Sequence, residues 1–305
     1  MRIKNTKLIV NPNADLGRAW RSAADLRPVI DELGGADWTG TVYPTHAIEL
    51  ARQAAEDGYD HVIAVGGDGT VHEVINGLMQ ARVEKPPRLG IVPLGTGNDF
   101  AQSLGLPNDP SSALRQTMNG RPKKIDIGFL QDERGRKEYW NNTLGIGFDT
   151  TVTLRSRRIP ILSGFPVYFI AVVQTILLDH TPIQVKMLVD GEQKEEQILM
   201  LVLCNGSNEG GGFKMAPDAK PDDQRLEYVY VGKISRPRMF RLLPEVIKGT
   251  HLRFPEVKHG HFKRMEIRAD RPMYIHTDGE IYSGFGADIR QVEVEILPGA
   301  LEVLV

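Results

Sequence analysis

Hydrophobic and polar positions follow one pattern over the first 120 residues of the chain. Short apolar runs at residues 8–10, 38–42, 61–65 and 89–92 are separated by segments with helical spacing, such as residues 71–79. Runs of this length predict strands, and their alternation with helices is typical of βαβ units, whose strands lie parallel. The pattern therefore predicts an α/β domain built around a parallel sheet.

The pattern changes after residue 126, where apolar residues recur at every second position. Such runs occupy residues 184–189, 226–231, 263–268, 292–296 and 301–305. Two helix candidates, residues 164–178 and 235–248, interrupt them. Alternation with period two predicts half-buried strands, so we expect a mainly β second domain, a sandwich or a curled sheet. The expected division is residues 1–130 and 131–305, with a last strand that can return to the first domain.

Length and charge narrow the functional classes. The 305 residues are more than one hydrophobic core usually organises, which supports two domains. The formal net charge of -2 gives no overall basic field that could hold nucleic acid or anionic lipid. We therefore expect no nucleic-acid partner, and we expect any contact with a membrane to be local.

Three further features bear on the compartment. The single cysteine, Cys204, follows an apolar run, which favours a buried core residue and excludes a disulfide framework. The first residues lack the apolar region of a signal peptide, so we expect a cytoplasmic protein. The longest apolar stretch, residues 159–178, contains proline, glycine and polar residues, which favours a buried helix over a membrane span.

The strongest local motif is the corner Gly66, Gly67, Asp68, Gly69 and Thr70, between an apolar strand and a predicted helix. Glycines let the backbone bend tightly there, so that its N–H groups and the positive end of the helix face an anion. The carboxylate of Asp68 could then hold Mg²⁺ beside phosphate groups. A strand–turn–helix corner without a ligand would also account for the glycines.

A second glycine-rich corner, residues 93–100, follows the next strand and also precedes a helix, which Asn98 or Asp99 could cap. The carboxyl ends of neighbouring parallel strands face one crevice, so both corners should lie at the same edge. Asn11 and Thr45 follow the first two strands and should lie there too. The chain lacks a P-loop motif and a complete dinucleotide fingerprint, and Asn76 interrupts a zinc-protease pattern that starts at His72.

Six motifs occur in an order that resembles the diacylglycerol-kinase-like lipid kinases of bacteria. They are NPN at residues 11–13, THA at 45–47, GGDGTVHE at 66–73, PLGTGNDFA at 93–101, IDIG at 125–128 and DGE at 278–280. The GGDGT element is shared with NAD kinases, whereas PLGTGNDFA is characteristic of the lipid kinase branch. The resemblance implies an N-terminal domain of phosphofructokinase-like topology and a C-terminal β-sandwich.

The resemblance also implies an ATP site in the first domain. The residues that match family positions for the nucleotide and its metal–phosphate network are Asn11, Thr45, Gly66, Gly67, Asp68, Gly69, Thr70, Glu73, Thr96, Asn98, Asp99 and Asp126. A separate loop resembles the family's structural Mg²⁺ loop, with ligands from the Asp223 carboxylate and the carbonyls of Lys220 and Arg225. Relatives usually carry glycine after that aspartate, and this chain has Gln224. An Asp-rich turn before a strand also needs no metal.

The resemblance places Asp278 and Glu280 near the acceptor hydroxyl, where a carboxylate must take the proton. An Asp-Gly pair is also common at the tip of a hairpin. We expect transfer of the γ-phosphate of ATP to a hydroxyl of diacylglycerol or a related lipid. The alternatives are an NAD kinase-like phosphotransferase and an inactive protein that binds nucleotide or lipid.

A local membrane contact is expected where three arginines precede apolar residues. The arginines are Arg155, Arg157 and Arg158, and the apolar side chains are Ile159, Ile161, Leu162 and Phe165. Clustered cations attract anionic lipids, and exposed apolar side chains add insertion energy. The sequence thus predicts a peripheral membrane protein, although the packing of a helix start would give the same pattern.

Overall fold

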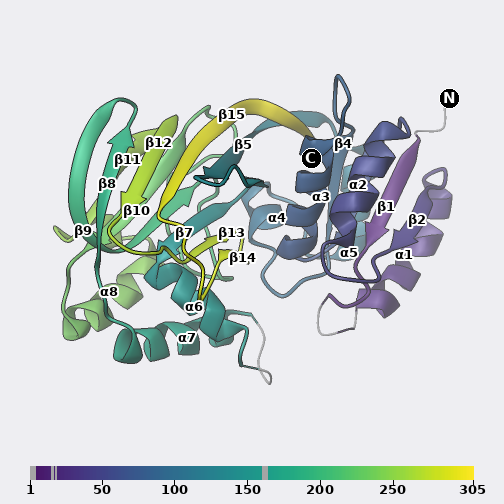
Figure 1. The fold of residues 1–305 in the computed structure, drawn as a ribbon. Coiled ribbons are helices and arrows are strands. Elements are labelled where there is room, and N and C mark those ends of the chain that lie inside the picture. Colours follow the sequence, from purple (N-terminus) through teal and green to yellow (C-terminus); the bar gives the residue numbers. More distant parts are fainter. Residues whose placement is uncertain (1–4, 15–16, 18, 160–163) are drawn as a thin grey trace. The chain divides into compact units, whose positions relative to one another are not determined.

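The chain forms two compact units in a computed structural model that describes residues 5–14, 17, 19–159 and 164–305 (Figure 1). The first unit contains Met1–Ile125 and Gly299–Val305, and the second contains Asp126–Pro298. The division thus lies five residues before the position expected from the sequence. Two long strands, β5 (Pro122–Asp132) and β15 (Gln291–Leu304), have residues in both units.

The first unit is built on a parallel sheet. Its strand order is β2 (Asp37–Gly40), β1 (Thr6–Val10), β3 (His61–Gly66) and β4 (Arg88–Pro93). The end of β15 continues the sheet through the pair Val303 and Leu89. All six residues of β3 are buried, as a continuous apolar run in a central strand predicts. The four predicted strands are confirmed.

Five helices accompany this sheet among the described residues. They are α1 (Ala19–Glu32), α2 (His46–Glu56), α3 (Asp68–Gln80), α4 (Asp99–Ser103) and α5 (Pro110–Asn119). Residues of α1 and α5 share one apolar core with β1, β3 and β4. Helices α2 and α3 approach closely at Gly77, where a Cβ would lie 2.3 Å from the Ile48 carbonyl oxygen.

The second unit is mainly antiparallel β structure. Its further strands are β6 (Lys137–Trp140), β7 (Thr143–Gly147), β8 (Ile183–Val189), β9 (Glu192–Cys204), β10 (Leu226–Gly232), β11 (Val257–Phe262), β12 (Arg264–Ala269), β13 (Ile275–Thr277) and β14 (Glu280–Ser283). The order β14-β13-β7-β9-β8-β12-β15 forms the longest path; β10 pairs with β9 and β11, and β5 pairs with β6 and β15.

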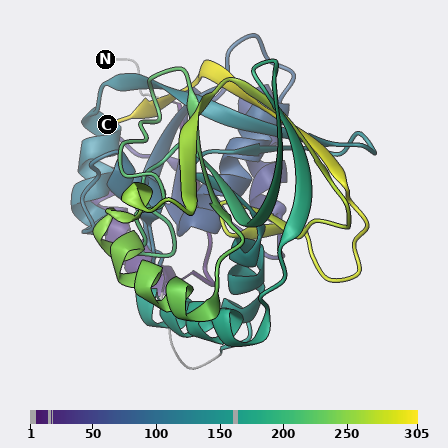
Figure 2. The same ribbon diagram turned by 90° about the vertical axis from the view of Figure 1, so that its left-hand side faces the viewer.

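Within the described part of this unit, three helices cover one side of these strands: α6 (Phe148–Ser156), α7 (Phe165–Leu178) and α8 (Arg236–Lys248), followed by the short 3-10 helix η2 (His251–Arg253) (Figures 1 and 2). Strand β9 shows why two cores form. Leu201 and Leu203 join the core between the strands, whereas Val202 and Cys204 join the core under the helices. The α/β first domain and the β-sandwich second domain are both confirmed.

Two expectations about apolar segments can be compared with the structure. Cys204 is fully buried, and burial raises the pKa of its thiol well above the ordinary value, in keeping with a core residue. Among the described residues no helix combines the length and the hydropathy needed to cross a bilayer.

Candidate active site

The two glycine-rich corners of the first unit touch each other. The N–H of Leu94 donates to the carbonyl of Gly66 at 2.8 Å, which joins the ends of β3 and β4. A Cβ on Gly95 would lie 2.4 Å from the Cα of Gly67, so no larger residue fits at that contact. The motifs at residues 66–70 and 93–100 therefore form one structure at the carboxyl edge of the sheet.

Two carboxylates flank this structure. Asp68 is the first residue of α3, and its Oδ1 accepts the N–H of Phe100 at 3.2 Å. A Cβ built on Gly97 would lie 3.0 Å from Oδ2 of Asp68 and 3.7 Å from Oδ2 of Asp99. Carboxylate oxygens are the ligands that Mg²⁺ prefers, and these two residues fit a cation held beside phosphate groups.

Asn98 stabilises the second corner in a way that the sequence did not indicate. Its Oδ1 accepts the N–H of Gly95 at 3.0 Å, and its Nδ2 donates to the carbonyl of the same residue at 2.9 Å. Neither Asn98 nor Asp99 caps α4: Asn98 occupies the N-cap position in a left-handed conformation without a side-chain cap bond. The capping prediction was wrong because the side chain closes the loop instead. Thr96 lies exposed in this corner.

The remaining predicted nucleotide residues are linked to one another within the first unit. Nδ2 of Asn11 donates to Oγ1 of Thr70 at 3.1 Å, which ties the end of β1 to α3. The carboxylate of Glu73 accepts the N–H groups of Thr45 at 3.0 Å and Ala47 at 3.1 Å, at the start of α2. Glu73 thus satisfies two N–H groups of a helix terminus and fixes the position of Thr45.

In the predicted Mg²⁺ loop, Gln224 stands where relatives usually carry glycine, and its backbone adopts a conformation typical of glycine. Gln224 has a φ of 64°, a left-handed conformation that glycine adopts freely, and its N–H donates to Oδ2 of Asp126 at 2.7 Å. Asp126 is 1% exposed and holds this loop through that hydrogen bond. Oδ2 of Asp223 accepts a hydrogen bond from Nε of Arg225 at 3.0 Å. This guanidinium competes with a cation for Asp223, and the Mg²⁺ site at Lys220, Asp223 and Arg225 stays a prediction.

Asp278 and Gly279 form the two-residue turn between β13 and β14. Both have positive φ, 52° and 81°, as a type I′ hairpin turn requires. The carboxylate of Asp278 accepts the N–H groups of Asn142 at 2.8 Å and Thr143 at 3.0 Å through Oδ1, and that of Asn141 at 3.0 Å through Oδ2. The turn is therefore a hairpin tip, and its first acid anchors the hairpin to β7 and the residues before it.

Glu280 has different surroundings. Its Oε2 lies 2.6 Å from a guanidinium nitrogen of Arg157, and its side chain is 43% exposed. The same nitrogen of Arg157 also donates to the carbonyl of Gly279 at 2.8 Å. The two acids of the DGE motif thus differ: Asp278 is fixed by backbone N–H groups, and Glu280 is partly exposed and paired with Arg157.

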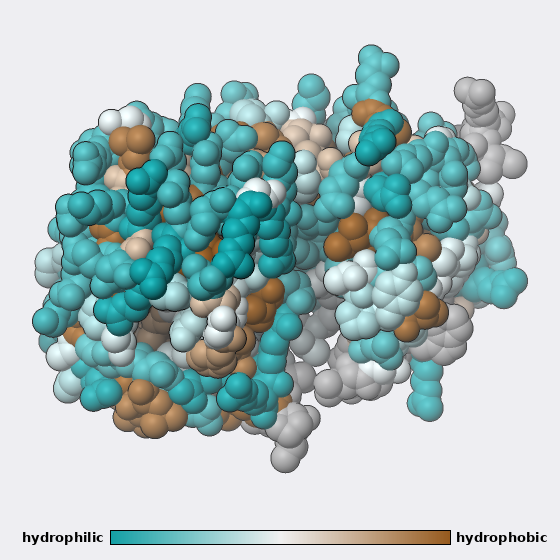
Figure 3. Space-filling view, viewed as in Figure 1, coloured by the Kyte–Doolittle hydropathy of each residue, from teal (hydrophilic) through white to brown (hydrophobic). Residues whose placement is uncertain are grey.

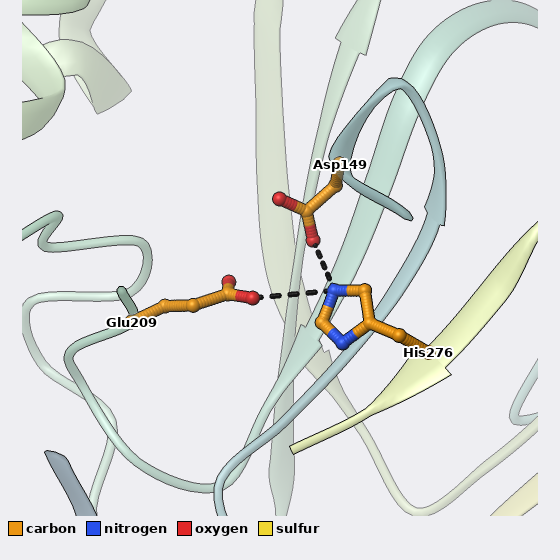
Figure 4. Close-up of side chains that lie close together, drawn as sticks. All are labelled: Asp149, Glu209 and His276. Carbon is orange, nitrogen blue, oxygen red and sulfur yellow. Dashed lines mark hydrogen bonds and ion pairs between the residues drawn. The ribbon is translucent and has the colours of Figure 1, made fainter. Parts of the chain in front are cut away.

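A buried cluster that the sequence analysis missed lies directly behind this turn (Figure 4). Nε2 of His276 is 2.8 Å from Oδ2 of Asp149 and 3.2 Å from Oε1 of Glu209. The opposite Gly145 on β7 leaves room for this contact, because a Cβ there would lie 2.0 Å from the Asp149 oxygen. The three residues are far apart in the sequence, and no spacing connects them.

Hydrogen bonding decides what this cluster can hold. The ligand atoms of the three residues lie within 4.8 Å of one another, as in a cation site. However, Nε2 of His276 lies within hydrogen-bond distance of both carboxylates, so this nitrogen carries a proton and donates to them. A protonated Nε2 has no lone pair for a metal, so the geometry fits a hydrogen-bonded cluster and not a metal site.

The cluster retains an extra proton at neutral pH. Burial alone lowers the pKa of His276, but the charges of Asp149 and Glu209 outweigh it and raise the pKa to about 10. Burial and the charge of Asp149 raise the pKa of the Glu209 carboxyl as well. The three groups therefore share their protons, and the cluster holds one proton more at neutral pH than the separate groups would hold.

Next to the cluster the second unit contains an apolar pocket with about 80 Å³ of free space. Its wall includes Asp149 and Glu209 together with apolar side chains from α6, α7, α8 and neighbouring segments, among them Phe148, Val152, Val172, Phe213, Met215 and Leu243. Tyr168 also lines it, and the Tyr168 hydroxyl lies 3.7 Å from the position of a Cβ on Gly279. One end of the pocket is therefore close to the DGE turn.

Comparison with known proteins agrees with this arrangement. Residues 5–130 match the model of the diacylglycerol kinase catalytic domain, and residues 142–305 match that of the YegS C-terminal NAD kinase beta sandwich-like domain. The chain belongs to the diacylglycerol kinase-like lipid kinase family. The resemblance inferred from the six motifs is thereby confirmed for this family member.

Individual relatives of this diacylglycerol kinase-like protein extend over most of its length. A Chromohalobacter salexigens protein named as a YegS-like lipid kinase is 33% identical over 83% of this chain and 78% of its own. The diacylglycerol kinase of Bacillus subtilis is 28% identical over 92% of this chain and 91% of its own. A solved diacylglycerol kinase structure from Bacillus anthracis covers 100% of this chain and 97% of its own, with a TM-score of 0.74 at 21% identity, which supports the fold.

Proposed function

We propose that this protein transfers the γ-phosphate of ATP to a hydroxyl of diacylglycerol or a related lipid. The observation that carries the proposal is the apolar pocket of the second unit, which ends beside the Asp278-Gly279 turn. An acyl chain buried in that pocket would leave the polar end of the lipid near a carboxylate able to accept its proton. The same pocket offers few groups that could bind a dinucleotide acceptor.

The first unit supplies the proposed ATP site. The backbones of the two glycine corners are in contact at Gly67 and Gly95, where there are no side chains. Phosphate oxygens can therefore approach the main-chain N–H groups directly. Asp68 and Asp99 would hold Mg²⁺, which offsets the charge of the phosphate groups. Asn11 and Glu73 keep the loops around these corners in place through their bonds to Thr70 and Thr45.

Glu280 is the proposed general base. Its carboxylate accepts the proton of the lipid hydroxyl, the hydroxyl oxygen forms a bond to the γ-phosphorus, and the bond from that phosphorus to the bridging oxygen breaks, which releases ADP. Asp278 is a positioning residue in this scheme, because both its oxygens accept backbone N–H groups that hold the hairpin.

Transfer of labelled phosphate from ATP tests the proposal, with diacylglycerol, phosphatidylglycerol, a sphingoid base and NAD⁺ as acceptors. The Val172→Phe variant fills the pocket from α7 and should abolish lipid phosphorylation while ATP binding and thermal stability are retained. The Gln174→Ala variant changes an exposed residue of the same helix and should behave as wild type. Phosphorylation of NAD⁺ alone, or full lipid activity of Val172→Phe, would contradict the proposal.

The structure changes the expected membrane contact. Arg155 forms an ion pair with Asp179, and Arg157 pairs with Glu280, so two of the three predicted cations are neutralised by carboxylates. Arg158 lies over the ring of Phe285, at 5.6 Å from its centroid. Ile161 and Leu162 lie outside the described residues. This segment is therefore a weaker candidate for attraction to anionic lipid than its sequence indicated.

A neighbouring surface is a better candidate for the proposed peripheral contact. The end of α7 exposes Leu177 and Leu178, and α8 exposes Phe240. Nε of Arg236 donates to the carbonyl of Ile176 at 3.0 Å, which places the basic start of α8 beside these leucines. Figure 3 shows this hydrophobic surface at the lower left, at the end of α7. Both helices also line the apolar pocket.

Sedimentation with vesicles tests the α7–α8 surface. Vesicles that contain anionic lipid should bind the wild type, and the double variant Leu177→Ser and Leu178→Ser should bind less. The control is Leu188→Ser, which removes an exposed leucine of β8. Equal binding by the double variant and the control would show that the membrane contact lies elsewhere.

A further inference from the structure

The carboxyl of Glu209 has one oxygen for which the protein provides no partner. Oε1 contacts His276 at 3.2 Å, whereas Oε2 is buried and has no hydrogen-bond partner among the described residues. Glu209 also lines the apolar pocket. A buried polar atom without a partner is unfavourable, so such an atom in the wall of a pocket indicates a ligand group that completes it.

A tight turn holds the backbone of Glu209 in this position. Its N–H donates to the carbonyl of Phe213 at 2.8 Å, and the N–H of Phe213 donates back to Glu209 at 3.0 Å. Between them, Gly210 has a φ of 62° and packs so closely on α7 that a Cβ there would lie 3.1 Å from the Tyr168 ring. The tight turn thus fixes the backbone of Glu209 relative to Tyr168, which also borders the DGE turn, and the contact with His276 orients the carboxyl.

The cluster gives this part of the pocket a negative character. Asp149, His276 and Glu209 carry two carboxyl groups and one imidazole ring. Because one protonated ring offsets only one carboxylate, the cluster retains a net negative charge. An anionic group brought into the same apolar surroundings would be repelled. A hydroxyl can donate a hydrogen bond to the Glu209 carboxyl, and an ester carbonyl can accept one from its protonated form, which burial favours by raising the pKa of this carboxyl.

We infer that Glu209 binds the uncharged polar group next to the acyl chain of the lipid, and that the acidic cluster selects neutral lipid alcohols over lipids with an anionic head group. The inference rests on the proposed function and narrows its acceptor to glycerolipids that expose a hydroxyl or an ester. Glu209 is a specificity residue in this assignment, because it touches the lipid away from the oxygen that is phosphorylated.

Direct binding in the absence of ATP tests this assignment. The probes are 1-octanoylglycerol, which is neutral, and dioctanoyl-phosphatidylglycerol, which is anionic, both titrated calorimetrically below their aggregation concentrations. Glu209→Leu removes the hydrogen-bonding group and should weaken binding of octanoylglycerol about tenfold, the equivalent of one net hydrogen bond. Glu209→Gln keeps a donor and an acceptor and should bind octanoylglycerol nearly as well as wild type.

The affinity for the anionic lipid tests the proposed effect of the cluster's negative charge. Without the carboxyl of Glu209 the cluster can hold its proton on His276, where it neutralises Asp149. Glu209→Gln should therefore bind dioctanoyl-phosphatidylglycerol more tightly than wild type. The matched control is Glu195→Gln, an exposed acid of β9 that pairs with Lys186 at 3.5 Å, and it should leave both affinities unchanged.

The outcomes separate this inference from the proposed kinase activity. Unchanged octanoylglycerol affinity in Glu209→Leu, or unchanged discrimination between the two lipids in Glu209→Gln, overturns the role of Glu209 even if the protein phosphorylates diacylglycerol. The expected affinity changes support that role even if no phosphorylated lipid is formed. Should Glu209→Leu fail to fold, as judged by thermal melting, the Glu209→Gln comparison decides alone.

Discussion

Oδ1 of Asp278 accepts the backbone N–H of Asn142 at 2.8 Å, and this bond joins the tip of one hairpin to the start of β7. The N–H groups of Asn141 and Thr143 complete the set. In the Asp278→Asn variant, an NH₂ group replaces one of the two accepting oxygens and cannot accept a hydrogen bond from these N–H groups. We expect a loss of about 1–3 kcal/mol in the free energy of unfolding, measured by urea denaturation, because buried donors lose their acceptor. Unchanged stability would mean that the turn does not depend on this carboxylate.

Glu280→Gln should separate chemistry from stability. The side chain is 43% exposed and pairs with Arg157 at the surface, so its charge contributes little to folding. As the general base it should matter greatly for turnover, with an expected loss of about 10²–10⁴-fold. Steady-state lipid phosphorylation and equilibrium ATP binding measure the two effects. Wild-type turnover by this variant would place the base elsewhere, with Asp68 as the next candidate.

Asp68→Asn should leave the fold intact and abolish transfer. An asparagine Oδ1 can still accept the N–H of Phe100, so the contact between the two corners is retained. The negative charge that Mg²⁺ needs is lost, because a neutral amide is a weaker ligand for a hard cation. Thermal melting checks the first expectation, and phosphorylation over a range of Mg²⁺ concentrations checks the second. If the variant has full activity and the same dependence on Mg²⁺ concentration as wild type, the ATP-site assignment is contradicted.

Gln224→Gly should stabilise the loop around Asp126. A left-handed conformation costs a residue with a side chain about 1–2 kcal/mol, and the greater freedom of glycine in the unfolded chain offsets part of the gain. We expect a net increase of roughly 0.5–1 kcal/mol in urea denaturation. The control is Gln193→Gly in β9, where an extended backbone gives glycine no advantage and a loss is expected.

The buried cluster should make stability depend on pH. The pKa of His276 is raised to about 10 from an ordinary value of 6.5, so the folded state holds a proton that the unfolded state releases. This contribution is fully present below pH 6.5 and is lost as the pH rises through 10, with a slope of at most roughly 1.4 kcal/mol per pH unit.

Urea denaturation of wild type and His276→Gln between pH 6 and pH 10 measures this effect, with the difference between the two expected to shrink as the pH rises. A raised pKa of Glu209 acts with the same sign, since its proton is also favoured by folding. A difference that stays constant over the range would show that the cluster binds no extra proton.

The sequence determined the elements whose signal is local. Strand β3, predicted from a continuous apolar run, and strands β8, β10 and β12, predicted from alternating runs, all occur at the predicted positions. These predictions succeed because the burial of one or both faces of a strand determines which neighbouring residues are apolar. The glycine corners could also be recognised, since only glycine permits the contact of Gly67 with Gly95. Helix α6 was missed because its apolar residues do not follow a clear stripe.

The sequence also indicated the residues of the glycine-rich corners and of the DGE turn, but not which groups each side chain contacts. Glu73, which matches a nucleotide residue, accepts two N–H groups at the start of α2, and Asp126, which matches a metal-site residue, accepts the N–H of Gln224. Such roles depend on which backbone groups come within hydrogen-bond distance, and that distance is set by the packing of separate elements.

Only the tertiary structure brought Asp149, Glu209 and His276 together. They come from the start of α6, from a loop after β9 and from β13, and each taken alone is an ordinary polar residue next to a strand. Their contact exists because β13 pairs with β7 at Gly145, whose lack of a side chain leaves space for the Asp149 carboxylate. Local periodicity and backbone freedom can be predicted from the sequence. The sharing of a proton by three distant groups depends on strand register and burial, and both of these arise only in the folded chain.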